Sequence, residues 1–159
     1  MNDFKRSKVD IIIFLGGVLS VVLLDRFSKI FFANLLDVND SLILIKNIFH
    51  FTLVHNTGIA FGLFKDSGLI FFIIPIVLTG LLIYNIYYYR HTEKLSRLYI
   101  AAFSLILGGA IGNLIDRIVF GYVIDFSDFR IWPVFNIADS AITIGAAIIL
   151  LKCIPSSSK

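Results

Sequence analysis

Three carboxylates in one short segment are the residues of this chain whose types and spacing could do chemistry. Asp125, Asp128 and Asp139 lie within residues 121–140, GYVIDFSDFRIWPVFNIADS, between two long apolar runs. Asp139 stands at the start of the second run, where a carboxylate would be carried into hydrocarbon, and the cost of that burial makes it a functional-site candidate. A second carboxylate nearby would raise the pKa of one member, so the pair could hold one proton near neutral pH. An acid and a base side by side can hydrolyse an amide bond.

The composition of the chain is that of an integral membrane protein. Of its 159 residues, 58% are hydrophobic and 16% are charged, whereas soluble domains average about 45–50% apolar and about 25% charged residues. The formal net charge of +3 is small, and the basic residues are grouped as in membrane-protein loops, so no nucleic-acid partner is expected. The single cysteine, Cys153, excludes an internal disulfide.

Four apolar runs approach the roughly 20 residues that cross a bilayer as a helix. They cover about residues 11–32, 69–89, 98–120 and 134–154, and they leave outer loops at about 33–68 and 121–133. No small-residue cleavage site follows the first run, so we expect a retained span and not a removed signal peptide. We therefore predict that residues 1–159 form a single membrane domain, an all-α bundle of four transmembrane helices.

Lysine and arginine residues are unevenly divided between the two sides of such a bundle. The segments at both termini and between the second and third spans carry eight of them: Lys5, Arg6, Lys8, Arg90, Lys94, Arg97, Lys152 and Lys159. The two opposite loops carry three: Lys46, Lys65 and Arg130. Because basic loops stay on the cytoplasmic side, both termini are predicted to be cytoplasmic. The polar residues within the spans then lie near the outer leaflet.

Polar side chains within three spans are spaced so that they share helix faces. Residues three or four apart are neighbours on a helix, and this spacing joins Asp25 with Lys29, Asn113 with Asp116 and Arg117, and Asn136 with Asp139. Asp25 and Lys29 can neutralise each other, which favours a structural role. Asn136 and Asp139 could also serve as polar contacts between helices, and for Asp116 structural and functional roles are both open.

The first outer loop is too long for a plain connection, and part of it has the pattern of a strand. Phe49, Phe51 and Leu53 alternate with their neighbours as in a half-buried strand, and the turn-forming sequence Asn56-Thr57-Gly58 follows. Residues 59–68, IAFGLFKDSG, are expected to form a short interfacial helix. Residues 121–128 can supply another strand, so a small extracytoplasmic β-sheet is predicted over the polar cluster.

Metal-assisted and covalent catalysis find little support in the sequence. His50 and His55 would lie on opposite faces of the predicted strand, with no cysteine or third histidine nearby, so no metal or other cofactor is expected. Ser140 has no histidine placed to activate it as a nucleophile. Asp128 is interpreted as a solvated loop residue. The groups that remain are carboxylates, amides and an arginine, which suit hydrolysis by water.

Two other classes of protein could use the same membrane architecture. A small proton- or ion-conducting protein could use buried carboxylates, but its polar residues should continue to the cytoplasmic side, whereas here they stop in the outer third of the spans. A non-catalytic membrane scaffold would need no such cluster.

Four sequence boxes resemble those of the lipoprotein signal peptidase (signal peptidase II) family of bacterial membrane aspartyl proteases. The boxes are LDRFSK at 24–29, FTLVHNTGIAFGLF at 51–64, GGAIGNLIDR at 108–117 with GYVIDF at 121–126, and FNIADS at 135–140. Any one of them alone would be a weak signal, but four in this order on four spans are highly specific and cover nearly the whole chain.

The resemblance implies an aspartic endopeptidase that cleaves prolipoproteins before a diacylglyceryl-modified cysteine, surrounded by membrane lipid and without a cofactor. We expect a monomer in the bacterial cytoplasmic membrane, with its active site near the outer leaflet. The catalytic dyad would be Asp125 and Asp139. Lining or supporting residues would be Asn56, Gly58, Asn113, Arg117 and Asn136, and residues that hold the site together would be Asp25, Lys29 and Asp116. Which dyad member holds the proton stays open, because a coupled pair titrates as a unit.

Overall fold

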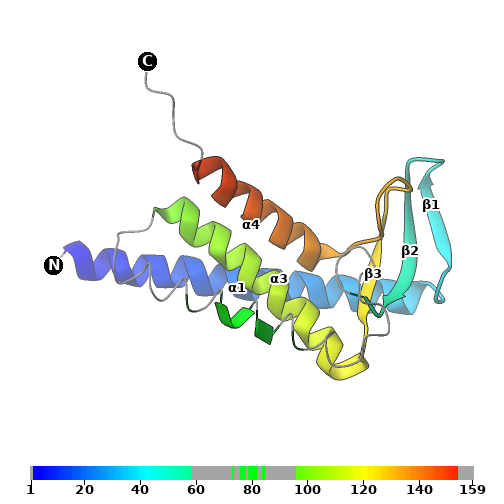
Figure 1. Ribbon diagram of the computed structural model, residues 1–159, viewed down its shortest axis with the longest axis horizontal. Helices are drawn as coiled ribbons and strands as arrows, with labels where there is room; N and C mark the ends of the chain where they lie inside the picture. The colour runs from blue at the N-terminus through cyan, green and yellow to red at the C-terminus, as the bar shows by residue number, and fades with distance from the viewer. Residues whose placement is uncertain are drawn as a thin grey trace, which may run out of the picture.

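A computed structural model of the chain describes residues 2–58 and 96–153, together with the separate helical positions 73, 76, 77, 79–81 and 84. Its helices and strands follow the order α1, β1, β2, α3, β3, α4 (Figure 1). The interfacial helix predicted at 59–68 lies outside the described residues, and so does the second span predicted at 69–89, apart from those separate positions.

The first helix is the longest element of the protein. α1 (Asn2–Leu35) has 34 residues and exceeds the run predicted at 11–32 at both ends. At 1.5 Å per residue it extends about 51 Å, which is more than the roughly 30 Å of a hydrocarbon core. Among the described residues, positions 8–35 of α1 and the whole of α3 (Arg97–Phe120) are long and apolar enough to cross a membrane. Leu19, Leu23 and Phe27 are exposed on α1, as expected for a helix whose surroundings are apolar.

Local signals explain where α3 begins and ends. The Ser96 hydroxyl accepts a hydrogen bond from the backbone N–H of Tyr99 (3.5 Å) and so caps the first turn. Gly121 follows the last turn with a φ of 78°, a left-handed conformation that glycine adopts without strain, and its N–H donates to the Arg117 carbonyl (3.0 Å). The helix therefore matches the span predicted at 98–120, and the chain turns directly into the strand that carries Asp125.

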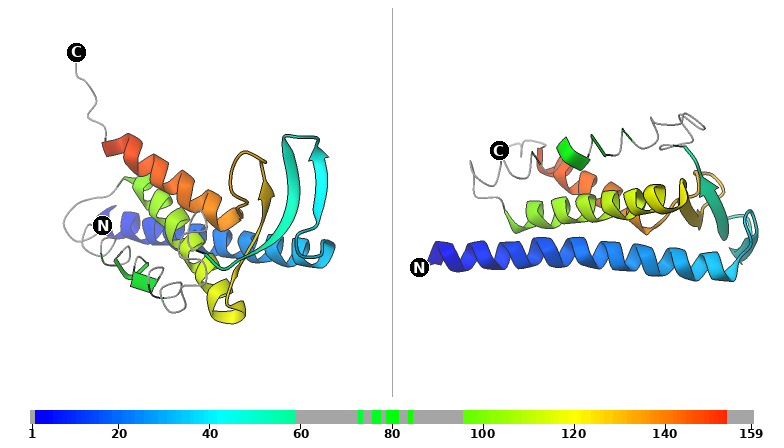
Figure 2. Two further views of the ribbon diagram at one scale, coloured as in Figure 1. Left: turned by 45° about the vertical axis from the view of Figure 1, so that its right-hand side comes forward. Right: turned by 90° about the horizontal axis from the view of Figure 1, so that it is seen from below.

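Small residues let α3 pack closely against both α1 and α4 (Ile137–Cys153), and Figure 2 shows the three helices side by side. A Cβ atom at Gly109 would meet the backbone carbonyl of Ala138, and one at Gly112 would meet the carboxylate of Asp25. The close approach brings the polar residues of three helices to one level of the bundle. α4 begins later than the run predicted from residue 134, because Asn136 caps its first turn.

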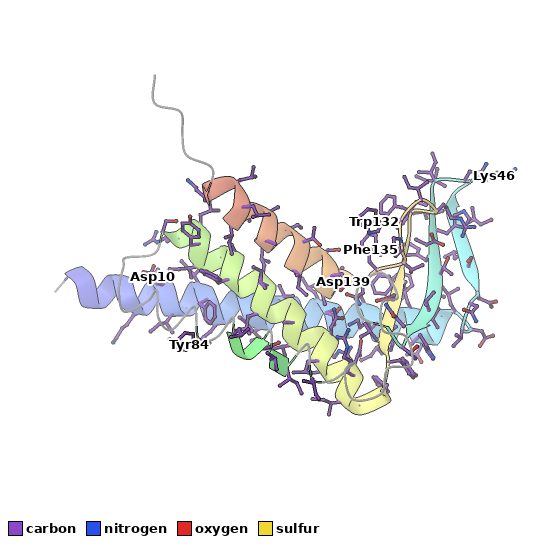
Figure 3. All side chains as sticks on the ribbon, in the orientation of Figure 1. Asp10, Lys46, Tyr84, Trp132, Phe135 and Asp139 are labelled. Carbon is purple, nitrogen blue, oxygen red and sulfur yellow. The ribbon has the colours of Figure 1, made fainter. Side chains whose placement is uncertain are left out.

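The sheet is antiparallel, with the strand order β1-β2-β3, and it lies at the end of the bundle where α1 ends (Figure 1). β1 covers Ser41–Ile45, β2 covers Phe49–Asn56 and β3 covers Val123–Asp128. The hairpin of β1 and β2 projects to one side, with Lys46 at its tip (Figure 3). The predicted small sheet is confirmed. β1 was not predicted, because its sequence SLILI is apolar from Leu42 onward and exposed throughout, and so shows no alternation.

A hydrophobic cluster joins the sheet to α1. Phe32, Leu53, Ile124 and Phe126 form it, and the rings of Phe32 and Phe126 are stacked with their centroids 4.4 Å apart. Aromatic pairs at this spacing add to the free energy gained from buried area. The cluster therefore fixes β3, and with it Asp125, relative to the end of α1.

The interpretation of Asp128 as a solvated loop residue is wrong. Asp128 ends β3 and is only 5% exposed. Its carboxylate accepts hydrogen bonds from the Thr52 hydroxyl (2.9 Å), the Arg130 backbone N–H (2.8 Å) and the Arg130 guanidinium (2.9 Å). Arg130 adopts a φ of 64°, which turns its backbone N–H and its side chain back toward the strand. A turn of this kind leaves no recognisable signal in the sequence.

Candidate active site

The two carboxylates that the sequence singled out come from different elements and meet at one asparagine. Asp125 is the third residue of β3, and Asp139 is the third residue of α4, at the end of that helix nearest the sheet (Figure 3). The side-chain amide of Asn136 donates to Asp125 Oδ1 (2.6 Å), and the backbone N–H of Asn136 donates to Asp139 Oδ2 (3.3 Å). A single residue therefore holds both carboxylates of the predicted dyad.

The position of Asp139 follows from how α4 begins. Asn136 precedes the first helical residue, and its Oδ1 accepts the backbone N–H of Asp139 (2.9 Å). In return, the Asp139 carboxylate accepts the backbone N–H of Asn136. This is the reciprocal pattern of a capping box, in which the first and fourth residues satisfy each other's free N–H groups. The short motif Asn-x-x-Asp thus starts a helix and aims a carboxylate with the same hydrogen bonds.

Two further asparagines bind the carboxylate oxygens of the dyad that Asn136 does not contact. Asn113 on α3 donates its amide to Asp139 Oδ1 (2.8 Å). Asn56, at the end of β2, donates its amide to Asp125 Oδ2 (2.9 Å). The Asn56 side-chain oxygen accepts the backbone N–H of Gly58 (2.9 Å), which fixes the orientation of the amide. Four carboxylate oxygens therefore each have an N–H donor, and three asparagines provide all of these donors.

Burial gives Asp125 an unusual acidity. Its side chain is 1% exposed. This burial and the nearby Asp139 carboxylate raise the pKa of Asp125 to about 7, although hydrogen bonds from Asn56 and Asn136 and the charge of Lys29 act in the opposite direction. A carboxyl group with this pKa can hold a proton at neutral pH and release it during a reaction.

A second group of charged residues lies directly behind the dyad, between α1 and α3. The Lys29 ammonium contacts Asp25 Oδ2 (2.8 Å) and Asp116 Oδ2 (2.7 Å), and all three side chains are fully buried. Arg26 forms an ion pair with the other oxygen of Asp116. The predicted pairing of Asp25 with Lys29 is therefore confirmed. Asp116, for which structural and functional roles were both open, forms ion pairs with Lys29 and Arg26.

These buried ion pairs also hold the backbone on which the dyad stands. Asp25 Oδ1 accepts the backbone N–H of Ala138 (3.1 Å), the residue before Asp139. Asp116 Oδ2 accepts the backbone N–H of Ile124 (3.2 Å), the residue before Asp125. Asp25 thus holds the backbone next to Asp139, and Asp116 holds the backbone next to Asp125.

Arg117 and Arg26 complete the charged surroundings. Arg117 is buried, donates to the backbone carbonyl of Asn113 (3.3 Å) and interacts electrostatically with Asp139, Asp125 and Asp116. Sequence reasoning gave Arg26 no role. Its signal was nevertheless present, because an arginine in an apolar span needs a carboxylate, and Asp116 was the one that had no assigned partner.

All ten site residues predicted from the sequence are thus brought into one connected network at one end of the bundle. No group of three or more histidine, cysteine, aspartate and glutamate side chains that could hold a metal ion occurs among residues 2–58 and 96–153 or the separate described positions. The arrangement can position and activate a water molecule between two carboxylates, one of which can carry a proton.

Comparisons with known proteins agree with this geometry. The family model Peptidase_A8, described as signal peptidase (SPase) II, matches residues 17–155. The lipoprotein signal peptidase of Halothermothrix orenii is 47% identical over 134 residues, which cover 84% of this chain and 90% of that protein. The lipoprotein signal peptidase of Cupriavidus taiwanensis is 39% identical over 158 residues, covering 94% and 87% of the two chains. A solved structure of a bacterial membrane enzyme is 32% identical, with a TM-score of 0.78 and coverage of 91% and 94%. The chain therefore belongs to the signal peptidase II family.

Proposed function

We propose that Asp125 and Asp139 are the catalytic dyad of this chain, a signal peptidase II and thus an aspartic peptidase that cleaves signal peptides from prolipoproteins. The observation that carries the proposal is the hydrogen bonding of Asn136, which reaches both carboxylates. Two carboxylates on separate elements, joined through neutral amides and with one pKa near 7, are the groups that acid–base hydrolysis by water requires.

In this mechanism the ionised carboxylate takes a proton from water while the water oxygen bonds to the scissile carbonyl carbon. The protonated carboxyl group donates to the carbonyl oxygen. The proton taken from water then passes to the leaving amine nitrogen, and a hydroxyl of the tetrahedral intermediate returns its proton to the other carboxylate as the carbon–nitrogen bond breaks. No covalent bond to the enzyme forms. Asn56, Asn113 and Asn136 keep the carboxylate oxygens in place, and Gly58 and Arg117 support the same site.

The proposed substrate is a prolipoprotein segment that carries a diacylglyceryl-modified cysteine. The dyad lies where α4 begins, and exposed apolar side chains, including Phe27, Ile30 and Phe31, line the neighbouring part of α1. Such a surface favours acyl chains that remain in lipid while the peptide enters from the side. One copy of the chain supplies every residue of the proposed site, so a monomer suffices.

The finer membrane arrangement is also part of the proposal. It has four spans, at about 11–32, 69–89, 98–120 and 134–154, and both termini in the cytoplasm of a bacterium. The eight-to-three division of basic residues supports this orientation. Asp139 is the third residue of α4, about 5 Å from the start of that helix, which would put the dyad near the outer leaflet.

Thiol labelling tests the orientation. In a chain with Cys153→Ser, a membrane-impermeant reagent added outside should label Asp40→Cys and Arg130→Cys but not Glu93→Cys. The reverse pattern would place the dyad near the cytoplasmic leaflet and contradict the proposed arrangement.

Cleavage of a diacylglyceryl-modified prolipoprotein tests the dyad. Asp125→Asn and Asp139→Asn keep the shape of each side chain but remove its acid–base function, so each should lower kcat at least about 100-fold. Asp128→Asn is the matched control, because it changes another buried carboxylate on the same strand and should keep the parental rate. Circular dichroism should show that all three variants fold. Near-parental turnover by either dyad variant would refute the assignment.

A further inference from the structure

Asn113 links the ion-pair group to the dyad through the two ends of its side-chain amide. Its Oδ1 accepts from the Lys29 ammonium (2.9 Å) and from the Asn136 amide (3.1 Å), while its Nδ2 donates to Asp139 Oδ1 (2.8 Å). An ammonium group can only donate hydrogen bonds. Lys29 therefore permits one orientation of the Asn113 amide, with the oxygen toward Lys29 and an N–H toward Asp139.

The ammonium that sets this orientation cannot move away. Lys29 is fully buried between Asp25 Oδ2 (2.8 Å) and Asp116 Oδ2 (2.7 Å). Its contacts are with these two carboxylates and with Asn113 Oδ1, so each of its three N–H groups has an acceptor. A hydrogen bond from a charged donor also polarises the amide. The hydrogen bond that the amide N–H donates at its other end is then stronger.

The surroundings of the two dyad carboxylates are unequal as a result. Asp139 accepts the N–H of Asn113, polarised by Lys29, and the backbone N–H of Asn136 at the positive end of the α4 helix dipole. Asp125 stands on a strand, is 1% exposed, and accepts from the amides of Asn56 and Asn136. Donors and a helix N-terminus favour a negative charge, whereas deep burial opposes it.

The charges in and around the dyad sum to a value that fits a single proton. The dyad and the charged groups around it on α1, α3, β3 and α4 comprise, within the described residues, four carboxylates and three cations: Asp25, Asp116, Asp125, Asp139, Arg26, Lys29 and Arg117. With all seven ionised, the net charge is 3 − 4 = −1, so one proton makes the group neutral. On β2, the His55 ring stacks on Tyr122, and burial lowers the pKa of His55.

We propose that Lys29 is a positioning residue of the dyad: through Asn113 it directs an amide N–H at Asp139, and thereby fixes Asp139 as the carboxylate that takes the proton from water. Asp125 is then the carboxyl group that gives its proton to the scissile carbonyl oxygen as the water oxygen bonds to the carbonyl carbon. The inference rests on the proposed function, in which these two residues form the dyad.

Two variants separate the orientation of Asn113 from the net charge of the group. Asp25→Asn removes one negative charge, and its single side-chain oxygen can accept from either the Ala138 N–H or Lys29. Lys29 keeps Asp116 and Asn113 as acceptors. Asp25→Asn with Lys29→Met restores the parental net charge but removes the donor that orients Asn113. The measurements are kcat and KM for a diacylglyceryl-modified prolipoprotein in detergent across pH, with thermal melts to correct for the folded fraction.

The two variants should move the acid limb of the kcat profile in opposite directions. Asp25→Asn keeps the orientation of Asn113, and its limb moves to lower pH because less negative charge surrounds the dyad. In the double variant the Asn113 oxygen can turn toward Asp139, so the limb moves to higher pH by about one unit. The maximal kcat of the double variant then falls about tenfold or more, which is the loss of a hydrogen bond to a charged group, while KM stays unchanged.

A pH profile of the double variant that coincides with the parental one would overturn the proposal, because net charge alone would then set the protonation of the dyad. A loss of rate that only follows the folded fraction would overturn it as well. Should the double variant fail to fold, Asn113→Ala provides the same test, since it removes the amide and leaves the ion pairs of Lys29 intact. Failure of the proposed function itself has a different signature, which is turnover by Asp125→Asn or Asp139→Asn.

Discussion

Two pairs of buried carboxylates lie side by side in this protein, and different groups separate the members of each pair. Between Asp25 and Asp116 stands the Lys29 ammonium, within 2.8 Å and 2.7 Å of their oxygens. Between Asp125 and Asp139 stands Asn136, which contacts both through neutral N–H groups. The first pair is a set of ion pairs, and the second is a pair of acids joined by amides.

The difference explains why one pair can hold the fold and the other can do chemistry. A cation offsets the charge of its carboxylate partners, and Asp25 and Asp116 also accept hydrogen bonds from backbone N–H groups. An amide orients a carboxylate without cancelling its charge. The second pair therefore depends on a proton for neutrality, and a shared proton is what general acid–base catalysis uses.

The largest expected difference in stability is between Asp25→Ala and Asp139→Ala. Asp25→Ala leaves Lys29 with one carboxylate fewer and frees the Ala138 N–H, which should cost about 3–5 kcal/mol, the range for breaking a buried pair. Asp139→Ala relieves repulsion between like charges, so its melting temperature should equal or exceed that of the parent while turnover is lost. Thermal melts in detergent with matched cleavage rates compare the two variants.

Removing both partners sharpens the same comparison. Asp25→Ala with Lys29→Ala leaves neither charge of that pair unpaired, so part of the lost stability should return, although Asp116 then keeps only Arg26 as its cation. An Asp25→Ala variant that melts like the parent and yet is inactive would place Asp25 in the chemistry and would erase the distinction between the two pairs.

Much of this arrangement could be predicted from the sequence because it depends on local spacing. Asp25 and Lys29 are four apart on a helix and do form an ion pair. The alternation around Phe51 predicts β2, and the apolar run at 98–120 predicts α3. The family boxes, taken together, contain the residues that the structure joins in one connected network.

Contacts between distant segments could not be predicted in the same way. Arg26 pairs with Asp116 across 90 positions, and although an arginine in an apolar span indicates that a carboxylate lies nearby, local spacing does not show that the two helices meet there. Asn136 was expected to support the site, but its double role depends on a backbone N–H at the start of α4, which sequence spacing does not show. The burial of Asp128 depends on the turn at Arg130, where a positive φ brings the backbone back.

The dependence of stability on pH should separate the dyad from other carboxylates by its sign. The pKa of Asp125 is about 7 in the folded protein and about 3.9 when unfolded, so between these values the folded state binds more protons. The melting temperature should therefore fall as pH rises from about 4 to about 7, and Asp125→Asn should weaken that fall. Melts at a series of pH values would contradict this if both proteins followed the same curve.

Asp128 provides a control of opposite sign on the same strand. Burial raises the pKa of Asp128, but hydrogen bonds from Arg130 and Thr52 outweigh it and hold the pKa below its usual value. Its contribution to stability is therefore present above the unfolded pKa and is lost as pH falls through the folded one. Asp128→Asn should therefore lower the melting temperature at neutral pH, and the difference from the parent should shrink as pH falls through the acidic range.

The smallest expected effect is that of Arg26→Gln. The Arg26 side chain is 21% exposed, and Asp116 keeps Lys29 at 2.7 Å and the Ile124 N–H at 3.2 Å when the guanidinium is removed. Because water reaches the guanidinium and a fully buried cation remains, the loss should be about 1 kcal/mol or less. Cleavage should continue at close to the parental rate, since the carboxylates that Arg26 contacts among the described residues are Asp116 and Asp25, neither of which belongs to the dyad. If Arg26→Gln instead melted at as low a temperature as Asp25→Ala, the Arg26 guanidinium would be the main counter-charge of Asp116. Lys29 would then no longer be the cation that holds Asp25 and Asp116 together.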